Sequence, residues 1–358
     1  MLAPAPLPPE TMTLSATPDV TLLVAMRNEA ENIEVCLDSI LAQDYPPERL
    51  EVLVFDGYST DGSWEIAARV LADRPRAQLR RNPARIQAAA WNLGIDEAAG
   101  DVIGILSGHS ILAPDYVTAA VNVLRRTGAA MVGGPVRALG DGRVAETIAL
   151  AMSTPFGVGG AEFRYLDREQ QVDTVFMGVS TREVYRAFRF DEEMVRNQDD
   201  ELSYRLLDSG ARIICSPEIR SSYRSRTTLG GLWRQYFDYG RWKVRVMQKH
   251  PSQVRWRHLV PTVFVCSVLG SLLLAIVWRP GAILLALTLT AYGAAMAVSI
   301  AKVREEGRRG NLVLLPVVYI TLHGAYGLGV LAGLMRHRRW ASGSLSLMAR
   351  QLIRRARS

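Results

Sequence analysis

Apolar runs and polar clusters alternate along the first part of the chain. Continuous apolar runs predict buried strands at 20–26, 50–55 and 101–106. Apolar residues at helical spacing predict helices at 30–43, 63–72 and 86–99. This alternation predicts an α/β domain with a mixed, mainly parallel sheet and helices on both faces. Ligands of such sheets bind beyond the carboxyl ends of the strands, where this chain has its polar loops.

The pattern is weaker between residues 140 and 225. It predicts a helix at 145–152, a Gly-rich loop at 156–161, a strand at 172–180, a helix at 199–210 and a strand at 212–215. Residues 232–248 are amphipathic, aromatic and basic, which is typical of a helix at a membrane interface.

Three long apolar segments follow, at 258–278, 280–301 and 311–335. None contains Lys, Arg, Asp or Glu, and each is long enough to cross a bilayer. The basic flanks 241–257 and 302–309 then lie in the cytoplasm by the positive-inside rule. A full crossing by the third segment would put the basic residues after 335 outside, and His323-Gly324 lies at its centre. Three spans are the preferred interpretation, and a re-entrant or broken third segment stays open.

Composition and charge narrow the class of protein. The chain has 358 residues, 49% of them hydrophobic and 22% charged, which excludes collagens, disordered chains and disulfide scaffolds. The net charge is +7, and Lys and Arg gather at the edges of the apolar runs without any nucleic-acid-binding signature. Lipid head groups are therefore the favoured partner, and nucleic acid is not expected. Cys36, Cys215 and Cys266 form no pairing pattern, which favours a reducing compartment for the polar domain.

These patterns predict five regions. They are a disordered Pro-rich tail at 1–18, a cytoplasmic α/β domain at 19–230, an amphipathic interface helix at 231–257, a transmembrane region at 258–335 and a basic tail at 336–358.

The loop from Asp56 to Gly62 carries the first candidate chemistry. It follows a buried strand and precedes a helix, and its glycines permit a tight turn. The Asp56 carboxylate can accept a hydrogen bond from the N–H of a heterocycle. Asn28-Glu29 ends the neighbouring predicted strand, so the two loops together predict a nucleotide pocket. An Asx-rich turn that caps a helix is the alternative interpretation.

Several segments carry a resemblance to a known family: VAMRNEAENIEVCLDSILAQDYP, EVLVFDGYSTDGS and NPARIQAAAWNLGIDEAAGDVIGILSGHS. In these the chain resembles family 2 glycosyltransferases of the GT-A fold. Further segments are similar to the succinoglycan-biosynthesis branch, whose members add a glucosyl-type residue to a lipid-linked oligosaccharide: TPFGVGGAEFR, VRNQDDELSYRLLDSGARI, SPEIRSSYRSRTTLGGL and QYFDYGRWKVRV. The resemblance covers roughly residues 20–250.

The resemblance implies a nucleotide-sugar site, with Asp56 at the nucleobase, Arg27-Asn28-Glu29 at the base and ribose, and Arg85 within 82–92 facing the nucleotide. The implied binding residues are Arg27, Asn28, Glu29, Asp56, Gly57, Ser59, Arg85, Ser107 and Gly108.

The metal motif of the family, Asp-x-Asp, falls on Ser107-Gly108-His109, so both carboxylates are absent. The resemblance implies a divalent cation, Mg²⁺ or Mn²⁺, with His109 in place of the second carboxylate. A hydrogen bond from His109 to the diphosphate of the substrate is the alternative, and both stay open.

The catalytic Glu-Asp pair of the family falls on Gln198-Asp199. Asp199 is then the general base of an inverting transfer, and Asp200 is the alternative base. An acidic helix start favoured by the helix dipole explains the same residues without catalysis. A loose match to a Gln-x-x-Arg-Trp motif assigns Arg241, Trp242 and Lys243 to the diphosphate and the acceptor, unless they only anchor an interface helix.

Together these features imply a membrane-anchored inverting hexosyltransferase. The donor would be a nucleotide sugar, UDP-glucose first, and the acceptor a polyprenyl-linked lipid in surface (exo)polysaccharide synthesis. The expected location is the inner (plasma) membrane, multi-pass, with the catalytic domain in the cytoplasm. A polyprenyl-phosphate hexosyl synthase, a processive polymer synthase and an inactive nucleotide-sugar-binding scaffold protein are the alternatives.

Overall fold

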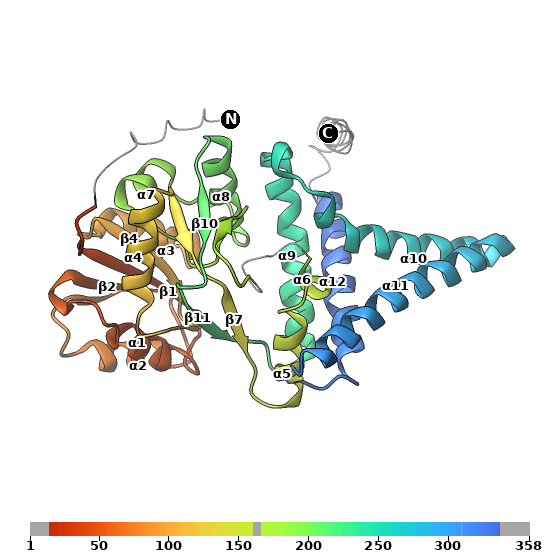
Figure 1. Cartoon of the computed structure of the whole chain (residues 1–358), viewed down its shortest axis with the longest axis horizontal. Coiled ribbons are helices and arrows are strands. Elements are labelled where there is room, and N and C mark those ends of the chain that lie inside the picture. The colour runs from red at the N-terminus through yellow and green to blue at the C-terminus, as the bar shows by residue number, and fades with distance from the viewer. Residues whose placement is uncertain (1–13, 160–165, 309, 337–358) are drawn as a thin grey trace. The chain divides into compact units, whose positions relative to one another are not determined.

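The computed structural model describes residues 14–159, 166–308 and 310–336. Residues 1–13 of the predicted tail and 337–358 of the basic tail lie outside them. The chain forms two compact units (Figure 1). The first contains Met1–Arg137 and Glu162–Arg224, and the second contains Ala138–Ala161 and Ser225–Ser358.

A mixed, mainly parallel sheet forms the centre of the first unit. Its strand order is β3-β2-β1-β4-β9-β6-β10-β8. β1 (Val20–Met26) lies between β2 (Leu50–Asp56) and β4 (Val102–Ser107), and both pairings are parallel. Every residue of β1 and β4 is buried, so both faces of the sheet are covered, and the three predicted strands are confirmed. The edge strand β3 (Ala77–Arg81) was not predicted, because its sequence AQLRR has no apolar run.

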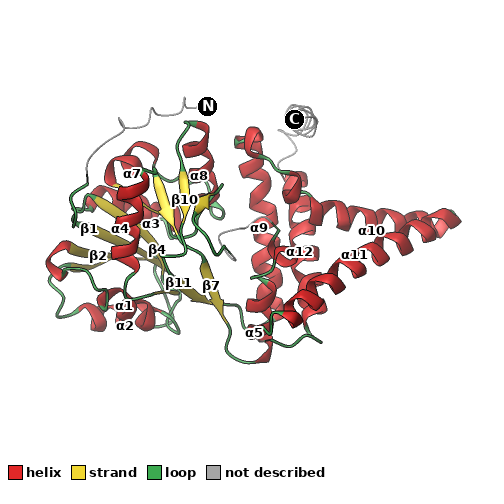
Figure 2. Cartoon of the chain, viewed as in Figure 1, coloured by secondary structure: helices red, strands yellow, loops and turns green. Residues whose placement is uncertain are grey.

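Helices cover the sheet as the sequence predicts (Figure 2). The predicted helices correspond to α1 (Ile33–Leu41), α2 (Ser63–Leu71) and α3 (Gln87–Glu97), and α4 (Tyr116–Thr127) is additional. Side chains that alternate along the strands, such as Leu23 and Phe55, share a core with Trp91 of α3. Burial of this apolar face holds α3 against the carboxyl halves of the strands.

Two predictions in the weaker region are wrong. The strand expected at 172–180 is reduced to β9 (Val179–Thr181), because the chain turns through Met177 at a φ of 55° before it enters the sheet antiparallel to β4. The Gly-rich loop expected at 156–161 begins as a short helix, α6 (Pro155–Val158), since Thr154 caps it by accepting from Gly157 N. Residues 160 and 161 of that loop lie outside the described residues.

The remaining elements of the first unit are short apart from one helix. The helix predicted at 199–210 is confirmed as α8 (Gln198–Asp208). The others are β5 (Ser110–Leu112), β6 (Met131–Gly133), β8 (Gln170–Gln171), α7 (Arg182–Phe188), β10 (Ile213–Cys215) and β11 (Ser221–Arg224). The first unit also contains the start of β7 (Val136–Leu139), whose last two residues belong to the second unit. A second sheet has the order β5-β11-β7.

The second unit is helical. It contains α5 (Arg143–Ala151), α6, α9 (Leu229–Lys249), α10 (Val260–Val277), α11 (Arg279–Glu305) and α12 (Leu315–Arg336). The last three are each long and apolar enough to cross a membrane. α10 and α11 form a hairpin, and α9 packs along α12 (Figure 1). The third apolar segment forms one continuous helix, so the alternative of a broken helix pair is wrong.

Helices α5 and α6 pack against α12, although the sequence patterns assign this stretch to the α/β domain. Thr154 Oγ1 lies 3.0 Å from Tyr319 Oη. His323 Nε2 donates to Phe156 O over 2.9 Å, so its Nδ1 accepts from Tyr292 Oη over 2.9 Å. The histidine at the centre of the third apolar segment is therefore a hydrogen-bonded packing residue that ties α6, α11 and α12 together.

Candidate active site

Three loops meet at the carboxyl ends of neighbouring strands in the first unit. They follow β1, β2 and β4, which are adjacent in the sheet. Backbone hydrogen bonds join the loops where they leave the strands: Gly57 N donates to Met26 O, and Gly108 N donates to Ala25 O. The site predicted from the sequence therefore has a common base.

Side chains extend this connection between the loops after β1 and β2. Asn28 N donates to Ser59 Oγ (2.9 Å), Thr60 N to Asn28 Oδ1 (2.9 Å), Ala30 N to Asp61 Oδ2 (3.0 Å) and Glu29 N to Ser63 Oγ (2.7 Å). The two loops consequently behave as one hydrogen-bonded element. Although partial burial opposes ionisation of Asp61, hydrogen bonds from Ser63 and from Ala30 N lower the pKa of this carboxyl group.

Asp56 lies at the centre of this element and is fully buried. Ser59 Oγ donates to its Oδ1 over 2.5 Å, and Arg81 donates to its Oδ2. The Arg81 guanidinium in turn lies 3.6 Å from the ring centroid of Trp64 and 5.3 Å from that of Tyr58. Sequence reasoning missed Arg81 and Trp64. The sequence held no signal for Arg81, because its place beside Asp56 depends on the edge strand β3, which has no apolar run.

Two further predicted binding residues are exposed at the rim of this region. Arg85 lies 5.1 Å from the ring centroid of Tyr58. Arg27 packs against Gly57, where an added Cβ would lie 3.2 Å from Arg27 Cδ. Both predicted guanidinium residues therefore lie beside the loop that follows Asp56, through Gly57 and Tyr58.

Backbone strain is concentrated around the same loops. Asn28, Tyr58, Arg85 and Asn197 have φ values between 54° and 60°, in the left-handed region. They follow β1, β2 and β3 and precede α8. Such a conformation costs on the order of 1–3 kcal/mol for a residue other than glycine, and it persists where surrounding contacts fix it. Strain of this kind is typical of binding and catalytic sites.

His109, in the loop after β4, pairs with the carboxylate of Glu29, in the loop after β1. His109 Nδ1 lies 2.9 Å from Glu29 Oε1, and Asn32 Nδ2 donates to Glu29 Oε2 over 3.0 Å. An added Cβ at Gly108 would lie 3.2 Å from Glu29 Cγ, so glycine leaves room for the Glu29 side chain. With Nδ1–H bound to the carboxylate, Nε2 of His109 carries the lone pair that can bind a cation or accept a hydrogen bond.

The donor set around His109 fits a divalent cation only in part. The described residues contain no group of three or more His, Cys, Asp or Glu side chains that could hold a metal. Mg²⁺ and Mn²⁺ are commonly held by one or two protein ligands together with substrate phosphates and water. His109 therefore suits a cation that takes most of its ligands from a diphosphate.

A chain of side-chain hydrogen bonds connects the end of β4 to the start of α8. Gln87 Nε2 donates to Ser107 Oγ over 2.8 Å, and Gln198 Nε2 donates to Gln87 Oε1 over 2.6 Å. Ser107 and Gln198 are buried, and Gln198 Oε1 accepts no hydrogen bond from the described residues. Sequence reasoning did not single out Gln87, because a lone Gln at a helix start carries no distinctive pattern.

The acidic residues at the start of α8 divide into two kinds. Glu201 is buried and paired with Arg205 over 2.9 Å, so it has a structural partner. Asp199 and Asp200 are partly exposed, and Asp200 N donates to Asp199 Oδ1 over 3.0 Å. Because Gln198 is tied to Ser107 through Gln87, the backbone that carries Asp199 is connected to the strand ends.

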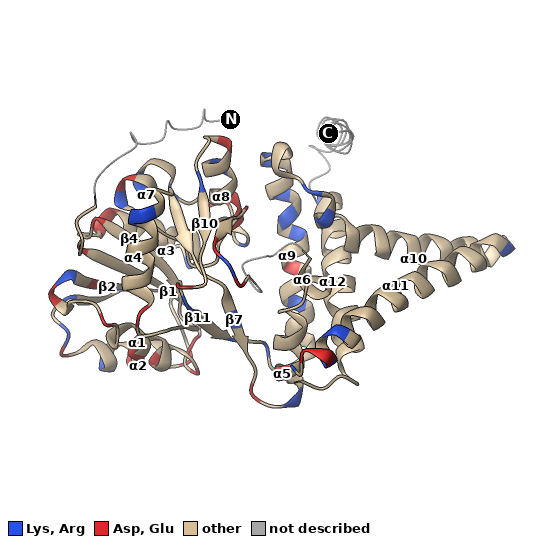
Figure 3. Ribbon diagram, viewed as in Figure 1, with Lys and Arg blue, Asp and Glu red and all other residues tan. Residues whose placement is uncertain are grey.

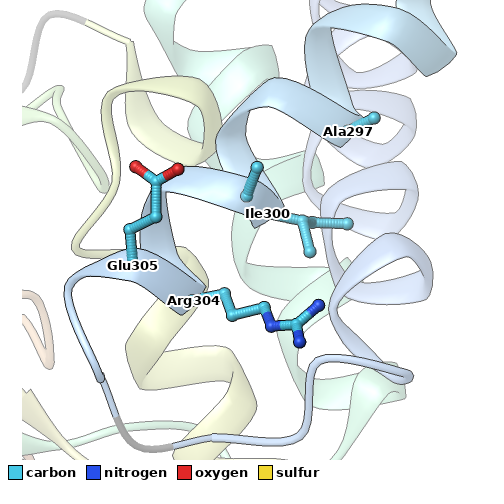
Figure 4. Close-up of a pocket in the computed structure, with 5 residues that line it drawn as sticks. Ala297, Ile300, Arg304 and Glu305 are labelled. Carbon is cyan, nitrogen blue, oxygen red and sulfur yellow. The ribbon is translucent and has the colours of Figure 1, made fainter.

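The other predicted residues lie in the second unit. Arg241, Trp242 and Lys243 are part of α9, where Arg241 pairs with Asp238 over 3.2 Å and Lys243 is buried. A hollow of about 610 Å³ lies on α11 of that unit, lined by Ala297, Ile300, Ala301, Arg304 and Glu305 (Figure 4). It contains none of the predicted site residues.

Comparison with known proteins gives a consistent assignment. The sequence profile of Glycosyl transferase family 2 matches residues 21–188. The succinoglycan biosynthesis protein ExoA of Rhizobium meliloti is 30% identical over 260 residues, which cover 72% of this chain and 78% of ExoA. A dolichyl N-acetyl-alpha-D-glucosaminyl phosphate 3-beta-D-2,3-diacetamido-2,3-dideoxy-beta-D-glucuronosyltransferase of Methanococcus voltae is 26% identical over 326 residues, covering 88% of this chain and 97% of that protein.

A solved structure supports the fold. The mannosyltransferase PcManGT of Pyrobaculum calidifontis, in complex with GDP-Man and Mn²⁺, superimposes with a TM-score of 0.57 at 20% identity, covering 90% of this chain and 88% of PcManGT. The sheet, the loops at its strand ends and these relatives agree with one another. The chain belongs to glycosyltransferase family 2 and is a glycosyltransferase with the GT-A fold.

Proposed function

We propose that this chain is a membrane-anchored inverting hexosyltransferase of surface polysaccharide synthesis. In this proposal it transfers a hexose, glucose in the first place, from a UDP-linked donor to a polyprenyl-linked acceptor. The observation that carries the proposal is the pair of hydrogen bonds that links Ser107, Gln87 and Gln198. They connect the strand ends with the residue that precedes Asp199. The relation to a succinoglycan biosynthesis protein supports the class of product.

The nucleotide would bind over the loops after β1 and β2. Tyr58 is 43% exposed and offers a ring face for stacking. Arg81 occupies the hydrogen-bonding position at Asp56, so a nucleobase N–H that binds Asp56 must share or displace that contact. Arg27, Asn28, Gly57, Ser59 and Arg85 would complete the nucleotide site.

Asp199 would act as the general base. As the acceptor hydroxyl oxygen bonds to the anomeric carbon, the bond from that carbon to the diphosphate oxygen breaks. The hydroxyl proton passes to the Asp199 carboxylate. One displacement from the opposite face inverts the configuration. Asp200, the next residue of α8 and also partly exposed, is the alternative base.

The departing diphosphate needs positive charge or hydrogen-bond donors. The Ser107 hydroxyl can donate to it, because Gln87 occupies its acceptor side. A divalent cation, when bound by His109 Nε2 and by the diphosphate, would neutralise part of the leaving charge. Arg241 and Lys243 would assist at the acceptor, with Trp242 available for stacking.

The acceptor and the location follow from the second unit. Its three apolar helices suit a protein that receives a lipid-linked substrate at the inner (plasma) membrane. Positive charge at the helix edges favours a cytoplasmic catalytic unit.

Membranes that contain the protein, incubated with a panel of radiolabelled nucleotide sugars and then extracted, test this proposal directly. Label from UDP-glucose in the lipid fraction, lost in the Asp199→Asn variant, is the expected result. Label on bare polyprenyl phosphate alone would instead indicate a polyprenyl-phosphate hexosyl synthase. Binding of UDP without any transfer, whatever the sugar, would indicate an inactive scaffold, which the missing Asp-x-Asp carboxylates favour as the second candidate.

A further inference from the structure

The three apolar helices of the second unit differ in how much of each the protein itself covers. Of the apolar window in each helix, 50% is buried in α12, 17% in α10 and none in α11. The mean hydropathy is also lowest in α12, at 1.5 against 2.4 in α10 and 2.0 in α11. The α10–α11 hairpin therefore offers its sides to lipid, whereas α12 is packed against protein.

The protein that covers α12 is chiefly α9, and the two helices touch through glycines. A Cβ at Gly329 would lie 2.1 Å from Phe237 O, one at Gly333 would lie 2.6 Å from Arg241 O, and one at Gly240 would lie 2.2 Å from Tyr326 O. From Gly329 to Gly333 on α12 the contact moves four residues along α9, from Phe237 to Arg241, so the helices run parallel and side by side. Close backbone contact of this kind leaves no space for lipid between them.

This pairing fixes the depth of the α9 charges relative to α12. Tyr326 lies near the middle of α12, and Gly240 lies beside it. Asp238, Arg241 and Lys243 are within one turn of Gly240 on α9, and Figure 3 shows basic residues along that helix. If α12 crossed a bilayer, these charged groups would lie near the centre of the hydrocarbon layer, where ionised side chains are strongly disfavoured.

The α10–α11 hairpin has the opposite character. α10 has 18 residues, a length of about 27 Å at 1.5 Å per residue, which matches the hydrocarbon thickness. Trp256 and Trp278 flank its two ends and are 72% and 58% exposed. Tryptophan at both ends of an apolar helix is typical of the two interfaces of a membrane.

We propose that α9 and α12 lie together in the membrane interface on one side of the bilayer, and that the α10–α11 hairpin makes the crossing. The partner of the α9–α12 pair is the lipid surface, with anionic head groups facing Arg234, which is exposed, and Arg241 and Arg245, which are partly exposed. The residues on either side of α12 then lie on the same side of the membrane. This inference does not depend on the donor, the acceptor or the catalytic base.

The arrangement also removes the conflict between the third apolar segment and the positive-inside rule. Basic residues occur before α10, after α11 and after α12, the last being Arg336, Arg338 and Arg339. With a single hairpin crossing, all three groups face one side. Only Arg279 remains at the tip of the hairpin.

Cysteine labelling in the full-length chain tests the arrangement. Cys36 and Cys215 are buried and Cys266 is exposed, so Cys266→Ser gives a suitable background. Single cysteines are then introduced as Val313→Cys, before α12, as Arg279→Cys, at the hairpin tip, and as a cysteine appended after Ser358. Val313 is 88% exposed and Arg279 is exposed, so these substitutions leave the packing intact.

The readout is reaction with a membrane-impermeant maleimide in intact cells and after lysis. We expect the Val313→Cys and appended cysteines to react from the same side, and the Arg279→Cys cysteine from the other. If the Val313→Cys and appended cysteines react from opposite sides, α12 crosses the membrane and the proposal is overturned. If the Arg279→Cys and Val313→Cys cysteines react from the same side, the hairpin does not cross and the proposal is equally overturned.

Discussion

Gln87 and Gln198 are 111 residues apart in the chain, yet their carboxamides share a hydrogen bond of 2.6 Å. Each begins a helix, α3 and α8, and Gln87 continues the chain of donors to Ser107 Oγ. The Gln198 carboxamide donates to Gln87, and the Gln87 carboxamide donates to Ser107 Oγ. The Ser107 hydroxyl accepts in this series, so its own hydrogen can be donated to an anion. If the oxygen and nitrogen of both carboxamides were exchanged, each hydrogen bond would reverse its direction, and the Ser107 hydroxyl would donate to Gln87. A diphosphate bound at Ser107, as proposed, would select the first direction.

Gln87→Met removes both hydrogen bonds at nearly constant volume. We expect affinity for UDP to fall roughly threefold to tenfold, the value of one or two neutral hydrogen bonds, with a larger loss in turnover because α8 is no longer held. Isothermal titration and transfer assays measure the two effects. Gln78→Met, on the edge strand β3, is the matched control. Equal values for the two variants would contradict a role for Gln87.

Asp199→Asn tests the proposed base. The variant keeps the size of the side chain but cannot take the proton, so turnover should fall by about 10²–10⁴ while affinity for UDP stays unchanged. Asp208→Asn, exposed at the other end of α8, should have neither effect. If Asp199→Asn is active and Asp200→Asn is not, the base is Asp200.

Arg81→Met should destabilise the first unit, because it removes the only cation that pairs with the buried Asp56 carboxylate among the described residues and leaves it the hydrogen bonds from Ser59. A buried polar group that loses its partner costs about 1–3 kcal/mol. Urea unfolding monitored by tryptophan fluorescence measures the change. Arg80→Met removes a guanidinium from the exposed face of the same strand and should cost less than about 1 kcal/mol. Equal losses would show that Asp56 does not depend on Arg81.

Acid should weaken the loop element through Asp61. Its pKa is lower in the folded chain than the ordinary value of 3.8, so ionised Asp61 stabilises the fold at any pH above that value. This contribution is lost as the pH falls through the lowered pKa. We expect Asp61→Asn to lower the melting temperature at neutral pH and to flatten its decline below about pH 4. Asp73→Asn, in the exposed loop after α2, should leave the pH profile unchanged.

Glu29→Ala tests whether the carboxylate orients His109. Loss of a carboxylate partner behind a metal-binding histidine weakens metal affinity by about 10–100-fold. Electron paramagnetic resonance of Mn²⁺ in the presence of UDP reports this affinity without any turnover. Glu31→Ala, an exposed neighbour on the same loop, is the control. Identical Mn²⁺ spectra for wild type, Glu29→Ala and His109→Ala would contradict the hypothesis that His109 binds a metal ion.

The sequence predicts well those helices and strands whose position is determined mainly by the burial of apolar side chains. The strands at 20–26 and 50–56 are continuous apolar runs buried on both faces, and no other arrangement hides them. The apolar helices are defined by length and absence of charge. Edge strands such as β3 have no such pattern, because one side faces water.

Long-range pairing explains what the sequence does not reveal about the site. Asn28 and Asp56 could be proposed because they follow predicted strands, and Ser59 and His109 through the resemblance to the family. Arg81, Trp64 and Gln87 could not, because their partners lie on other elements and depend on the register of the sheet. The strand expected at 172–180 failed for a related reason: the chain has to turn at Met177 to enter the sheet in the antiparallel direction.

Helices α5 and α6 have a practical consequence for anyone who wishes to study the catalytic half alone. They lie in the middle of the α/β sequence, but their contacts are with α12. A chain stopped before α9 would keep both helices and lose their packing partner, exposing Ile148 and its neighbours to water. Such a fragment should aggregate, whereas replacing residues 138–161 with a short polar linker gives a soluble protein the best prospect.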